Sequence, residues 1–327
     1  MNRVRVGVVG VGHLGSHHAR AWSRIEGADL AGGYDPDPAA RARAERELGL
    51  SMKDSLEALI ERVDAVSIAA PTPRHAEIAQ LCLSRGLHVL VEKPMASEPS
   101  EGESMLASAR SLRRALFVGQ VERFNPAVQA ARPHLKSPRF IEAHRLAPIV
   151  PRGIDVDVIL DLMIHDLDLA LWLTRSRVTE VHAVGVPVLT PRIDIANARL
   201  TFATGCVANL TASRVSREKV RKIRFFESNE YLSVDCLNRT VEAYTLKEAP
   251  SSGPTRPEDL LTRIRPLDVR VEAADPLEAE LTRFLSLTRE PEASWDESAV
   301  ALEALRVADE VRRQALRSRV FPLGSSV

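Results

Sequence analysis

The sequence predicts an α/β chain of two domains, in which a parallel sheet covered by helices precedes an α+β domain with an open, mainly antiparallel sheet. Two patterns predict this class. From Val4 to about Gly119, short β-branched runs alternate with longer amphipathic runs, which is typical of βαβ units on a parallel sheet. After Gln120, strand-type runs follow one another without helices between them, which indicates antiparallel pairing. We therefore expect one domain over residues 1–120 and a second over residues 121–327.

In the first domain, the expected strands and helices alternate along the chain. The strands are Arg5–Val9, Leu30–Tyr34, Ala65–Ala69, Leu87–Val91 and Leu116–Val118. The clearest helices are Ala39–Leu48, Ser55–Glu61, His75–Arg85 and Glu98–Leu112. Prolines follow two of the strands, at Pro71 and Pro94. Because loops at the carboxyl edge of such a sheet line the ligand crevice, we expect the site at this edge.

In the second domain, one helix-like stretch, Val158–Leu173, precedes the strands. The expected strands are Val178–Val188, Ala196–Phe202, Cys206–Arg214, Arg221–Glu227, Tyr231–Val234 and Thr240–Leu246. Lys247–Pro266 is rich in proline, serine and charge and is predicted to be an exposed loop. Two helices, Leu277–Leu287 and Glu297–Leu316, are expected to close the chain.

The most specific motif is a glycine run between the first strand and the helix that follows it. Gly10 permits a tight turn, Gly12 lets the backbone approach a pyrophosphate, and Gly15 lets the helix pack closely on the strand. His13 and Leu14 lie between these glycines, where the N–H groups of the helix N-terminus favour an anion. This spacing predicts a Rossmann dinucleotide-binding domain.

An acidic residue follows the glycine run at the distance that a ribose contact requires. Asp35 ends the second expected strand, twenty residues after Gly15. Its carboxylate is suited to accept hydrogen bonds from the adenosine ribose hydroxyls, whereas it would repel a 2′-phosphate. We therefore expect NAD as the cofactor in preference to NADP. The alternative, a glycine-rich turn followed by a solvent-exposed aspartate, is disfavoured by the strand before the motif and the helix after it.

The composition describes an ordinary globular chain. Of 327 residues, 45% are hydrophobic and 27% are charged, and 44 basic residues balance 44 acidic ones. This balance gives no large field that would favour nucleic acid or an anionic membrane surface. The three cysteines, Cys82, Cys206 and Cys236, are widely spaced, which indicates reduced thiols and neither a disulfide framework nor a metal cluster.

The chain offers no sign of a membrane or export segment. The first residues enter a strand at once, which leaves no room for the apolar segment of a signal peptide. No uncharged apolar stretch approaches the roughly 20 residues that span a bilayer. A cytoplasmic location is therefore expected.

A lysine stands where the fourth expected strand ends, in the tripeptide Glu92-Lys93-Pro94. Oxidising a secondary alcohol sends hydride to a nicotinamide while a nearby base takes the hydroxyl proton. Partial desolvation beside the cofactor ring would let the Lys93 amine exchange a proton near neutrality, and its charged form would polarise a carbonyl oxygen. A surface lysine beside a turn proline is the alternative.

Two polar residues on the apolar helix Val158–Leu173 form a second candidate cluster. Asp161 and His165 are four residues apart and so share one helix face. A substrate hydroxyl placed between them would meet His165 as proton acceptor or relay and Asp161 as the acceptor that orients it. The alternative is that Asp161 caps the helix and His165 is a satisfied core histidine. Metal binding fits the spacing, but no third ligand stands out, so no metal is predicted.

The glycine run, Glu92-Lys93-Pro94 and the later Asp-x-x-x-His stretch together resemble the Gfo/Idh/MocA family of NAD(P)-dependent sugar and polyol oxidoreductases. The resemblance covers nearly the whole chain. It implies that Lys93 contacts both cofactor and substrate and that Glu92 belongs to the cofactor site. It also implies that Pro71, Thr72 and His75 border the cofactor, with Thr72 suited to the ribose; for His75, an ordinary residue of a helix first turn is the alternative.

Several arginines and histidines have more than one possible role. Arg123 just after the first domain is suited to hold an anionic substrate group or to anchor the domain junction. Arg145 and Arg152 are the other nearby cations for a diphosphate. His17 and His18 lie behind the glycine turn and are expected to be packing or surface residues.

The stretch around Asp161 carries Leu, Met and Ile where small residues are common in the family. This variant resembles the branch that oxidises the 3-hydroxyl of UDP-N-acetylglucosamine for lipid A precursors. An inositol or other polyol dehydrogenase is the alternative within the family, and a non-catalytic NAD-sensing regulator is the alternative from another class. The resemblance also implies that the open sheet face pairs with other copies, giving a homodimer or homotetramer.

Overall fold

The computed structural model describes residues 3–149, 156–246 and 263–317, and it divides into two compact units. The first unit contains residues 1–124 and 275–305, and the second contains residues 125–274 and 306–327. The sequence prediction placed every residue after 120 in the second domain. In the structure, residues 275–305 pack with the first unit instead.

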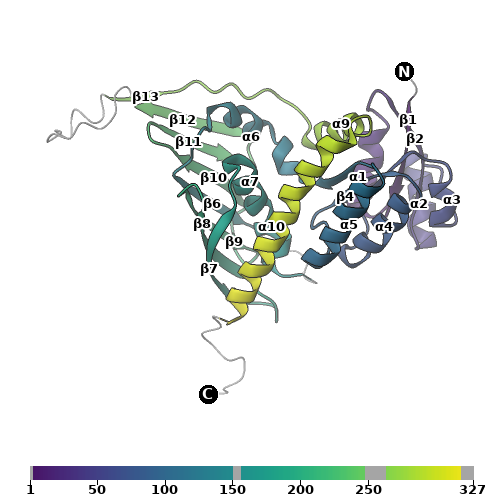
Figure 1. The fold of residues 1–327 in the computed structure, drawn as a ribbon, viewed down its shortest axis with the longest axis horizontal. Helices are drawn as coiled ribbons and strands as arrows, with labels where there is room; N and C mark the ends of the chain where they lie inside the picture. Colours follow the sequence, from purple (N-terminus) through teal and green to yellow (C-terminus); the bar gives the residue numbers. More distant parts are fainter. Residues whose placement is uncertain (1–2, 150–155, 247–262, 318–327) are drawn as a thin grey trace, which may run out of the picture. The chain divides into compact units, whose positions relative to one another are not determined.

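The first unit is built on a five-stranded parallel sheet (Figure 1). Its strands are β1 (Val4–Val9), β2 (Ala28–Tyr34), β3 (Ala65–Ile68), β4 (His88–Glu92) and β5 (Leu116–Gly119). Their order is β2-β1-β3-β4-β5, and every neighbouring pair is parallel. The chain moves outward from β1 to β2 and then returns to the other side at β3. The carboxyl ends of β1 and β3 therefore flank the point of reversal where α/β sheets bind ligands.

Helices connect these strands, and three of them have capped N-termini. They are α1 (His13–Trp22), α2 (Pro38–Leu48), α3 (Leu56–Ile60), the 3₁₀ turn η1 (Thr72–Arg74), α4 (His75–Ser84) and α5 (Pro99–Ser111). Asp37 and Ser55 cap α2 and α3 through side-chain oxygens, and Glu98 with Glu101 forms a capping box at α5. Each cap defines the residue at which the loop ends and the helix begins. The caps thereby fix the length and path of the loops that follow the strands.

The C-terminal helices complete the first unit. α9 (Pro276–Leu287) places Phe284 in ring contact with Trp22 and Phe117, each at 6.3 Å between centroids. α10 (Pro291–Arg317) lies along β5, where the Leu116 N–H donates to the Ser294 hydroxyl and the Ser298 hydroxyl donates to the Leu116 carbonyl. This packing covers the edge strand and explains why residues 275–305 belong to this unit.

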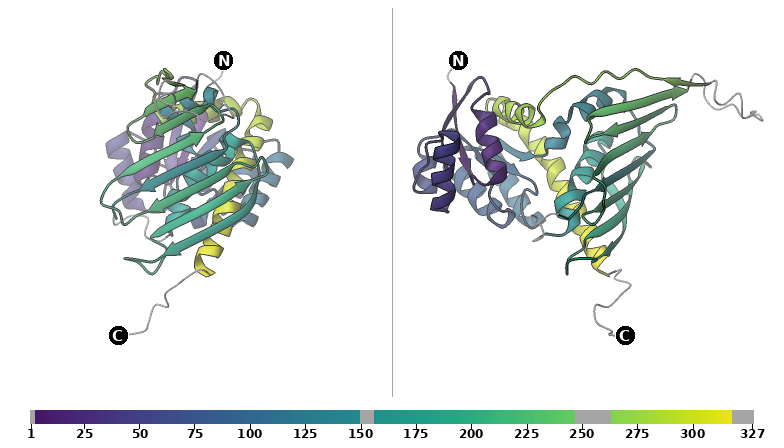
Figure 2. Two further views of the ribbon diagram at one scale, coloured as in Figure 1. Left: turned by 90° about the vertical axis from the view of Figure 1, so that its left-hand side faces the viewer. Right: turned by 180° about the vertical axis from the view of Figure 1, so that it is seen from behind.

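The second unit carries an eight-stranded mixed sheet, which confirms the predicted open, mainly antiparallel architecture. Its strands are β6 (Phe140–Leu146), β7 (Val178–Val186), β8 (Ile195–Phe202), β9 (Val207–Ser213), β10 (Val220–Phe226), β11 (Glu230–Asp235), β12 (Thr240–Leu246) and β13 (Ile264–Pro266). Their order is β13-β12-β11-β10-β6-β9-β8-β7, and β6 with β9 is the parallel pair. One face of the sheet is open in Figure 2, and helices lie on the other.

Four helical segments of the second unit lie near this sheet. They are α6 (Pro126–Ala131), the 3₁₀ turn η3 (Arg132–His134), the π-helical segment η4 (Ile159–Met163) and α7 (Ile164–Thr174). A further 3₁₀ turn, η2 (Val121–Phe124), ends the first unit's N-terminal segment. The sequence prediction missed α6 and β6. It was also wrong at the end of the expected loop Lys247–Pro266, because Ile264–Pro266 pairs with β12; residues 247–262 lie outside the described residues.

Candidate functional site

The turn between β1 and α1 is as tight as the glycine spacing predicts. Gly10 has a φ of +85°, and a Cβ there would lie 2.8 Å from the carbonyl carbon and oxygen of Ala69. A Cβ on Gly15 would lie 1.8 Å from the carbonyl oxygen of Gly10. Neither position has room for a side chain, so both glycines are required for the backbone path itself.

Gly12 differs, because the space above it is open. A Cβ on Gly12 would meet no atom of the described residues within 4 Å, and its φ of −66° is not in the left-handed region. Gly12 is the N-cap of α1, and no described side chain caps this helix. Gly12, His13 and Leu14 are all exposed. The first N–H groups of α1 are therefore presented to an anion, as a dinucleotide pyrophosphate requires.

Asp35 lies at the carboxyl end of β2, beside this turn. One carboxylate oxygen accepts a hydrogen bond from the Val11 N–H at 2.9 Å, and the other accepts from the Asp37 N–H at 3.0 Å. Arg41 donates to the Asp35 carbonyl at 2.7 Å. The half-buried carboxylate is thus fixed next to the glycine turn, with acceptor capacity remaining on both oxygens.

Glu92 points into the interior of the first unit. Its Oε1 lies 2.8 Å from Nε2 of His18, whose Nδ1 lies 2.5 Å from the hydroxyl of Ser67. Its Oε2 accepts from the Lys93 N–H at 3.3 Å. His18 was expected to be a packing or surface residue; it is fully buried, as a packing residue is, and it also forms a polar bridge between α1, β3 and β4 that was not expected.

Lys93 follows this strand end directly, and its backbone is held on the other side by His75. The peptide bond between Lys93 and Pro94 is cis. Nδ1 of His75 lies 2.9 Å from the Pro94 carbonyl, and Nε2 lies 2.7 Å from the Ala70 carbonyl. The two carbonyls favour the charged imidazolium, but burial is the larger effect and lowers the pKa of His75. His75 is 1% exposed, so it anchors the loop from inside, while Thr72 is partly exposed and Pro71 is exposed.

Asp161 and His165 lie in the second unit on consecutive helical segments. Asp161 is in the π-helical segment and His165 is in the first turn of α7. Asp157 precedes this segment, and its Oδ1 accepts from the N–H groups of Ile159 and Leu160, both at 3.1 Å. Asp161 therefore does not serve as the N-cap. π-Helical turns occur often at functional sites, which favours a role for Asp161 in a site.

The arginines proposed for an anionic substrate group have structural contacts. Arg145 is buried and forms a two-pronged ion pair with Asp166, at 3.0 and 2.8 Å. Arg123 is 2% exposed and donates to the Glu297 carbonyl at 3.2 Å, which anchors α10 within the first unit. Arg152 lies outside the described residues.

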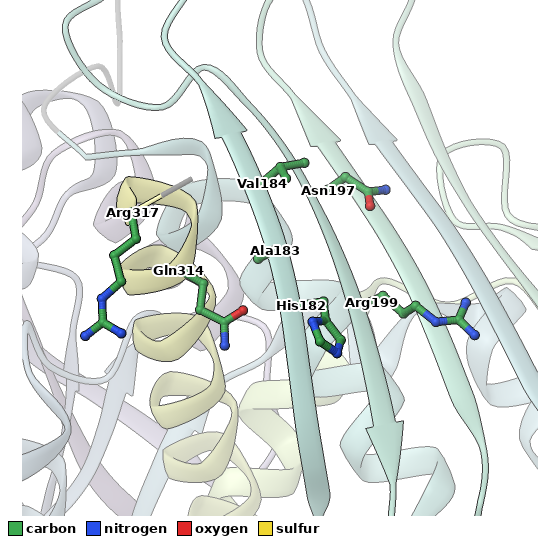
Figure 3. A pocket seen from close by; sticks show the side chains of 7 residues that line it. All are labelled: His182, Ala183, Val184, Asn197, Arg199, Gln314 and Arg317. Carbon is green, nitrogen blue, oxygen red and sulfur yellow. The ribbon is translucent and has the colours of Figure 1, made fainter. Parts of the chain in front are cut away.

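A separate pocket of about 560 Å³ lies at the β7 edge of the second unit's sheet (Figure 3). It is lined by His182, Ala183, Val184, Asn197, Arg199, Gln314 and Arg317. Gln314 and Arg317 project from α10, and the other five residues come from β7 and β8. None of the residues predicted for the site lines it.

Other chemistries find little support among the described residues. No group of three His, Cys, Asp or Glu side chains in residues 3–149, 156–246 and 263–317 is arranged to hold a metal ion. All three cysteines are buried, and burial raises the pKa of Cys82 to about 12 and that of Cys206 to about 11, so these thiols are poor nucleophiles. Within the same ranges, no helix has the length and apolar character needed to cross a bilayer.

Comparison with known proteins identifies the family. Residues 4–120 match the model described as an oxidoreductase family with an NAD-binding Rossmann fold, and residues 118–231 match the Gfo/Idh/MocA C-terminal domain. The chain belongs to the Gfo/Idh/MocA family of oxidoreductases. The predicted enzyme class and a nicotinamide dinucleotide cofactor are thereby confirmed, and the open Gly12 turn with Asp35 beside it fits that cofactor.

Two family members illustrate the similarity. UDP-N-acetylglucosamine 3-dehydrogenase from Acidithiobacillus ferrooxidans is 40% identical over 287 residues, which cover 88% of this chain and 89% of the relative. Its solved structure is similar with a TM-score of 0.87 at 37% identity, covering 96% of this chain and 98% of the other. Inositol 2-dehydrogenase from Rubrobacter xylanophilus is 32% identical over 65% of this chain and 66% of the relative.

Proposed function

We propose that this enzyme oxidises the 3-hydroxyl of UDP-N-acetylglucosamine with NAD, giving the 3-keto sugar nucleotide. The observation that carries the substrate is the 40% identity to UDP-N-acetylglucosamine 3-dehydrogenase over 88% of this chain. The inositol 2-dehydrogenase covers only 65% of the chain, at 32% identity. A role in supplying lipid A precursors follows only if this substrate is correct.

The preference for NAD rests on Asp35. Its carboxylate is held by the Val11 and Asp37 N–H groups beside the glycine turn, which is where an adenosine ribose would lie. Two ribose hydroxyls can donate to this carboxylate, whereas a 2′-phosphate there would place like charges together. Arg41, whose guanidinium donates to the backbone at Asp35, is the nearby cation that would favour NADP if Asp35 lost its charge.

The proposed chemistry divides between the two units. A bound nicotinamide supplies the hydride acceptor. Lys93, at the carboxyl end of β4, contacts the substrate oxygen and, when charged, polarises the carbonyl in the reverse reaction. His165 accepts the hydroxyl proton, and Asp161 accepts a hydrogen bond from the substrate that orients it in the site. These roles are part of the proposal, as are the contacts of His13, Leu14, Thr72 and Arg123 with the ligands.

The open face of the second unit's sheet is the proposed interface between copies of the chain. Across β8 and β9 this face is polar, with Asn197 donating to Thr211 and Arg199 donating to Asn209. On the edge strand β7 it carries the exposed side chains of Val184 and Val186. Light scattering on a size-exclusion column tests the proposed homodimer or homotetramer.

The activity is tested by mixing the purified protein with NAD and UDP-N-acetylglucosamine and following absorbance of the reduced nicotinamide. Hydroxylamine is added to trap the ketone and draw the equilibrium forward. Lys93→Ala is expected to abolish reduction with little change in NAD affinity. Lys53→Ala is the matched control, because Lys53 belongs to the same unit and its amine donates to the Ser51 hydroxyl at 2.8 Å.

Each other outcome has a meaning of its own. Turnover of myo-inositol without turnover of UDP-N-acetylglucosamine rejects the substrate and keeps the family chemistry. NAD binding with no turnover of any sugar favours the NAD-sensing regulator.

A further inference from the structure

We propose that His18 is a positioning residue for Lys93, acting through the carboxylate of Glu92. This inference rests on the catalytic role proposed for Lys93. It assigns a function to a buried histidine that lies on the pyrophosphate helix and outside the glycine motif. Its two hydrogen-bond partners, Ser67 and Glu92, lie in the same unit as His18 and Lys93.

The hydrogen bonds of His18 fix one arrangement of the bridge. His18 and Ser67 are fully buried, and Glu92 is 7% exposed. A carboxylate only accepts, so Nε2 of His18 carries the hydrogen toward Glu92 Oε1, 2.8 Å away. In the neutral ring, Nδ1 then accepts from the Ser67 hydroxyl at 2.5 Å. Each buried polar atom of the chain Ser67–His18–Glu92 thereby has a partner, as buried polar groups require.

The chain resembles a Ser-His-acid triad only in composition. Ser67 is 0% exposed and lies in the middle of the buried strand β3, where no substrate reaches its hydroxyl. Its hydroxyl also faces Nδ1, and the carboxylate faces Nε2. The bridge is therefore a support and not a nucleophile.

Glu92 is confined from its other side by Gly119 on β5. A Cβ added to Gly119 would lie 2.8 Å from Oε1 and 3.0 Å from Cδ of Glu92. The carboxylate thus fits against the bare Cα of Gly119 on one side and is bound by His18 on the other. Its second oxygen accepts from the Lys93 N–H at 3.3 Å. The position of the carboxylate therefore helps to determine the position of the Lys93 backbone.

The consequence is a physical link between two parts of the cofactor site. α1 presents its N-terminus toward the proposed pyrophosphate position, and His18 in the same helix holds the strand end that carries Lys93. The Pro94 carbonyl on the far side is held by His75. Lys93 is therefore flanked by two residues that buried imidazoles fix in place, which holds its backbone at the end of β4 and sets the point from which its side chain extends.

The test uses two amides that reproduce different halves of the imidazole. In His18→Gln the amide nitrogen replaces Nε2 and still donates to Glu92. In His18→Asn the shorter amide reaches only the Nδ1 position and loses Glu92. We expect kcat to fall about 10- to 100-fold in His18→Asn, with KM and the Kd for NAD nearly unchanged, because only the placement of Lys93 is lost. His18→Gln is expected to retain activity close to wild type.

A second variant approaches the same carboxylate from the opposite side. Gly119→Ala displaces the Glu92 carboxylate without altering His18, so we expect it to reproduce the kcat loss of His18→Asn. This variant keeps the proposal testable if His18→Asn does not fold, which circular dichroism decides. His17→Asn is the matched control, because His17 lies on the same helix and is exposed.

A readout without turnover separates this proposal from the proposed function. Acylation of Lys93 by a water-soluble succinimidyl ester, measured by peptide mass spectrometry against Lys53, is expected to rise severalfold in His18→Asn and Gly119→Ala and not in His18→Gln. If the wild type oxidises no sugar, the proposed function fails while this labelling still tests the positioning. Equal behaviour of the Asn and Gln variants in kcat and labelling, or wild-type behaviour of Gly119→Ala, would overturn it.

Discussion

The glycine turn makes opposite predictions for two neighbouring substitutions. In Gly12→Ala the new methyl group meets no described protein atom within 4 Å, whereas in Gly15→Ala it would lie 1.8 Å from the Gly10 carbonyl oxygen. The first substitution should therefore act on the ligand and the second on the fold. The contrast isolates what the motif does for binding from what it does for the backbone.

The magnitudes follow from these distances. The φ at residue 12 is not left-handed, so alanine gains about 0.4–1 kcal/mol from a stiffer unfolded chain. It loses a similar amount, about 0.5–1 kcal/mol, because alanine is a poorer N-cap than glycine, so stability stays almost unchanged. The methyl group pushes an anion away from the α1 N–H groups, and losing one charge-assisted hydrogen bond costs about 1.5–3 kcal/mol, so the Kd for NAD rises about 10- to 100-fold. Gly15→Ala forces the backbone apart and is expected to lower the free energy of unfolding by about 3 kcal/mol or more.

The assay pairs urea unfolding of the ligand-free protein with a fluorescence titration of NADH for each variant. Gly12→Ala with wild-type affinity would refute the placement of the pyrophosphate over Gly12. Gly15→Ala with wild-type stability would refute the turn geometry.

Three further predictions concern charge. Asp35→Asn should shift the ratio of Kd values for NAD and NADP toward NADP by about tenfold or more, because it removes the charge that opposes a 2′-phosphate, and an unchanged ratio would contradict the NAD assignment. Burial lowers the pKa of His88 to about 4, so as the pH falls below about 6.5 the unfolded chain takes up a proton before the folded chain does. The free energy of unfolding, measured with urea, should therefore fall by up to about 3 kcal/mol between pH 6.5 and 4. It should fall less in His88→Asn, which keeps an acceptor for the Ala115 N–H. Asp166→Asn leaves the buried Arg145 guanidinium without its carboxylate and should destabilise by about 3–5 kcal/mol, whereas a loss below 1 kcal/mol would show that the pair is not buried in solution.

The strands of the first unit were predictable because their signal is local. β1 and β3 to β5 are short runs that contain β-branched residues, whereas β2 has none, and each of the five was found within two residues of its observed bounds. The class of the second sheet was predictable for the same reason. The periodicity of hydrophobic residues along a sequence reflects which side chains of an element are buried. In these elements the buried side chains follow a regular pattern, so the sequence alone predicts them.

β6 was missed because a charge occupies one of its inward positions. Its buried residues alternate as Ile141, Ala143 and Arg145. The arginine hides this alternation from the sequence, and its partner Asp166 comes 21 residues later on another element. A buried ion pair can be recognised only when the structure shows that its two residues lie next to each other.

The support of the site was hidden for a similar reason. His18 reads as one more polar residue in a helix, while its partners Ser67 and Glu92 lie 49 and 74 residues further along the chain. His75 likewise bonds only to backbone carbonyls, which have no sequence signature. The sequence motifs predicted which segments bind the ligands. The long-range contacts that hold those segments in place could be recognised only from the structure.

The most direct measurement uses UDP-N-acetylglucosamine carrying deuterium at C3 of the sugar, with NAD and hydroxylamine. Mass spectrometry of the reduced cofactor is expected to show one deuterium per molecule, and the trapped sugar nucleotide should carry an oxime at C3. Reduced cofactor without deuterium, or none formed while an unlabelled polyol is oxidised, would contradict the account.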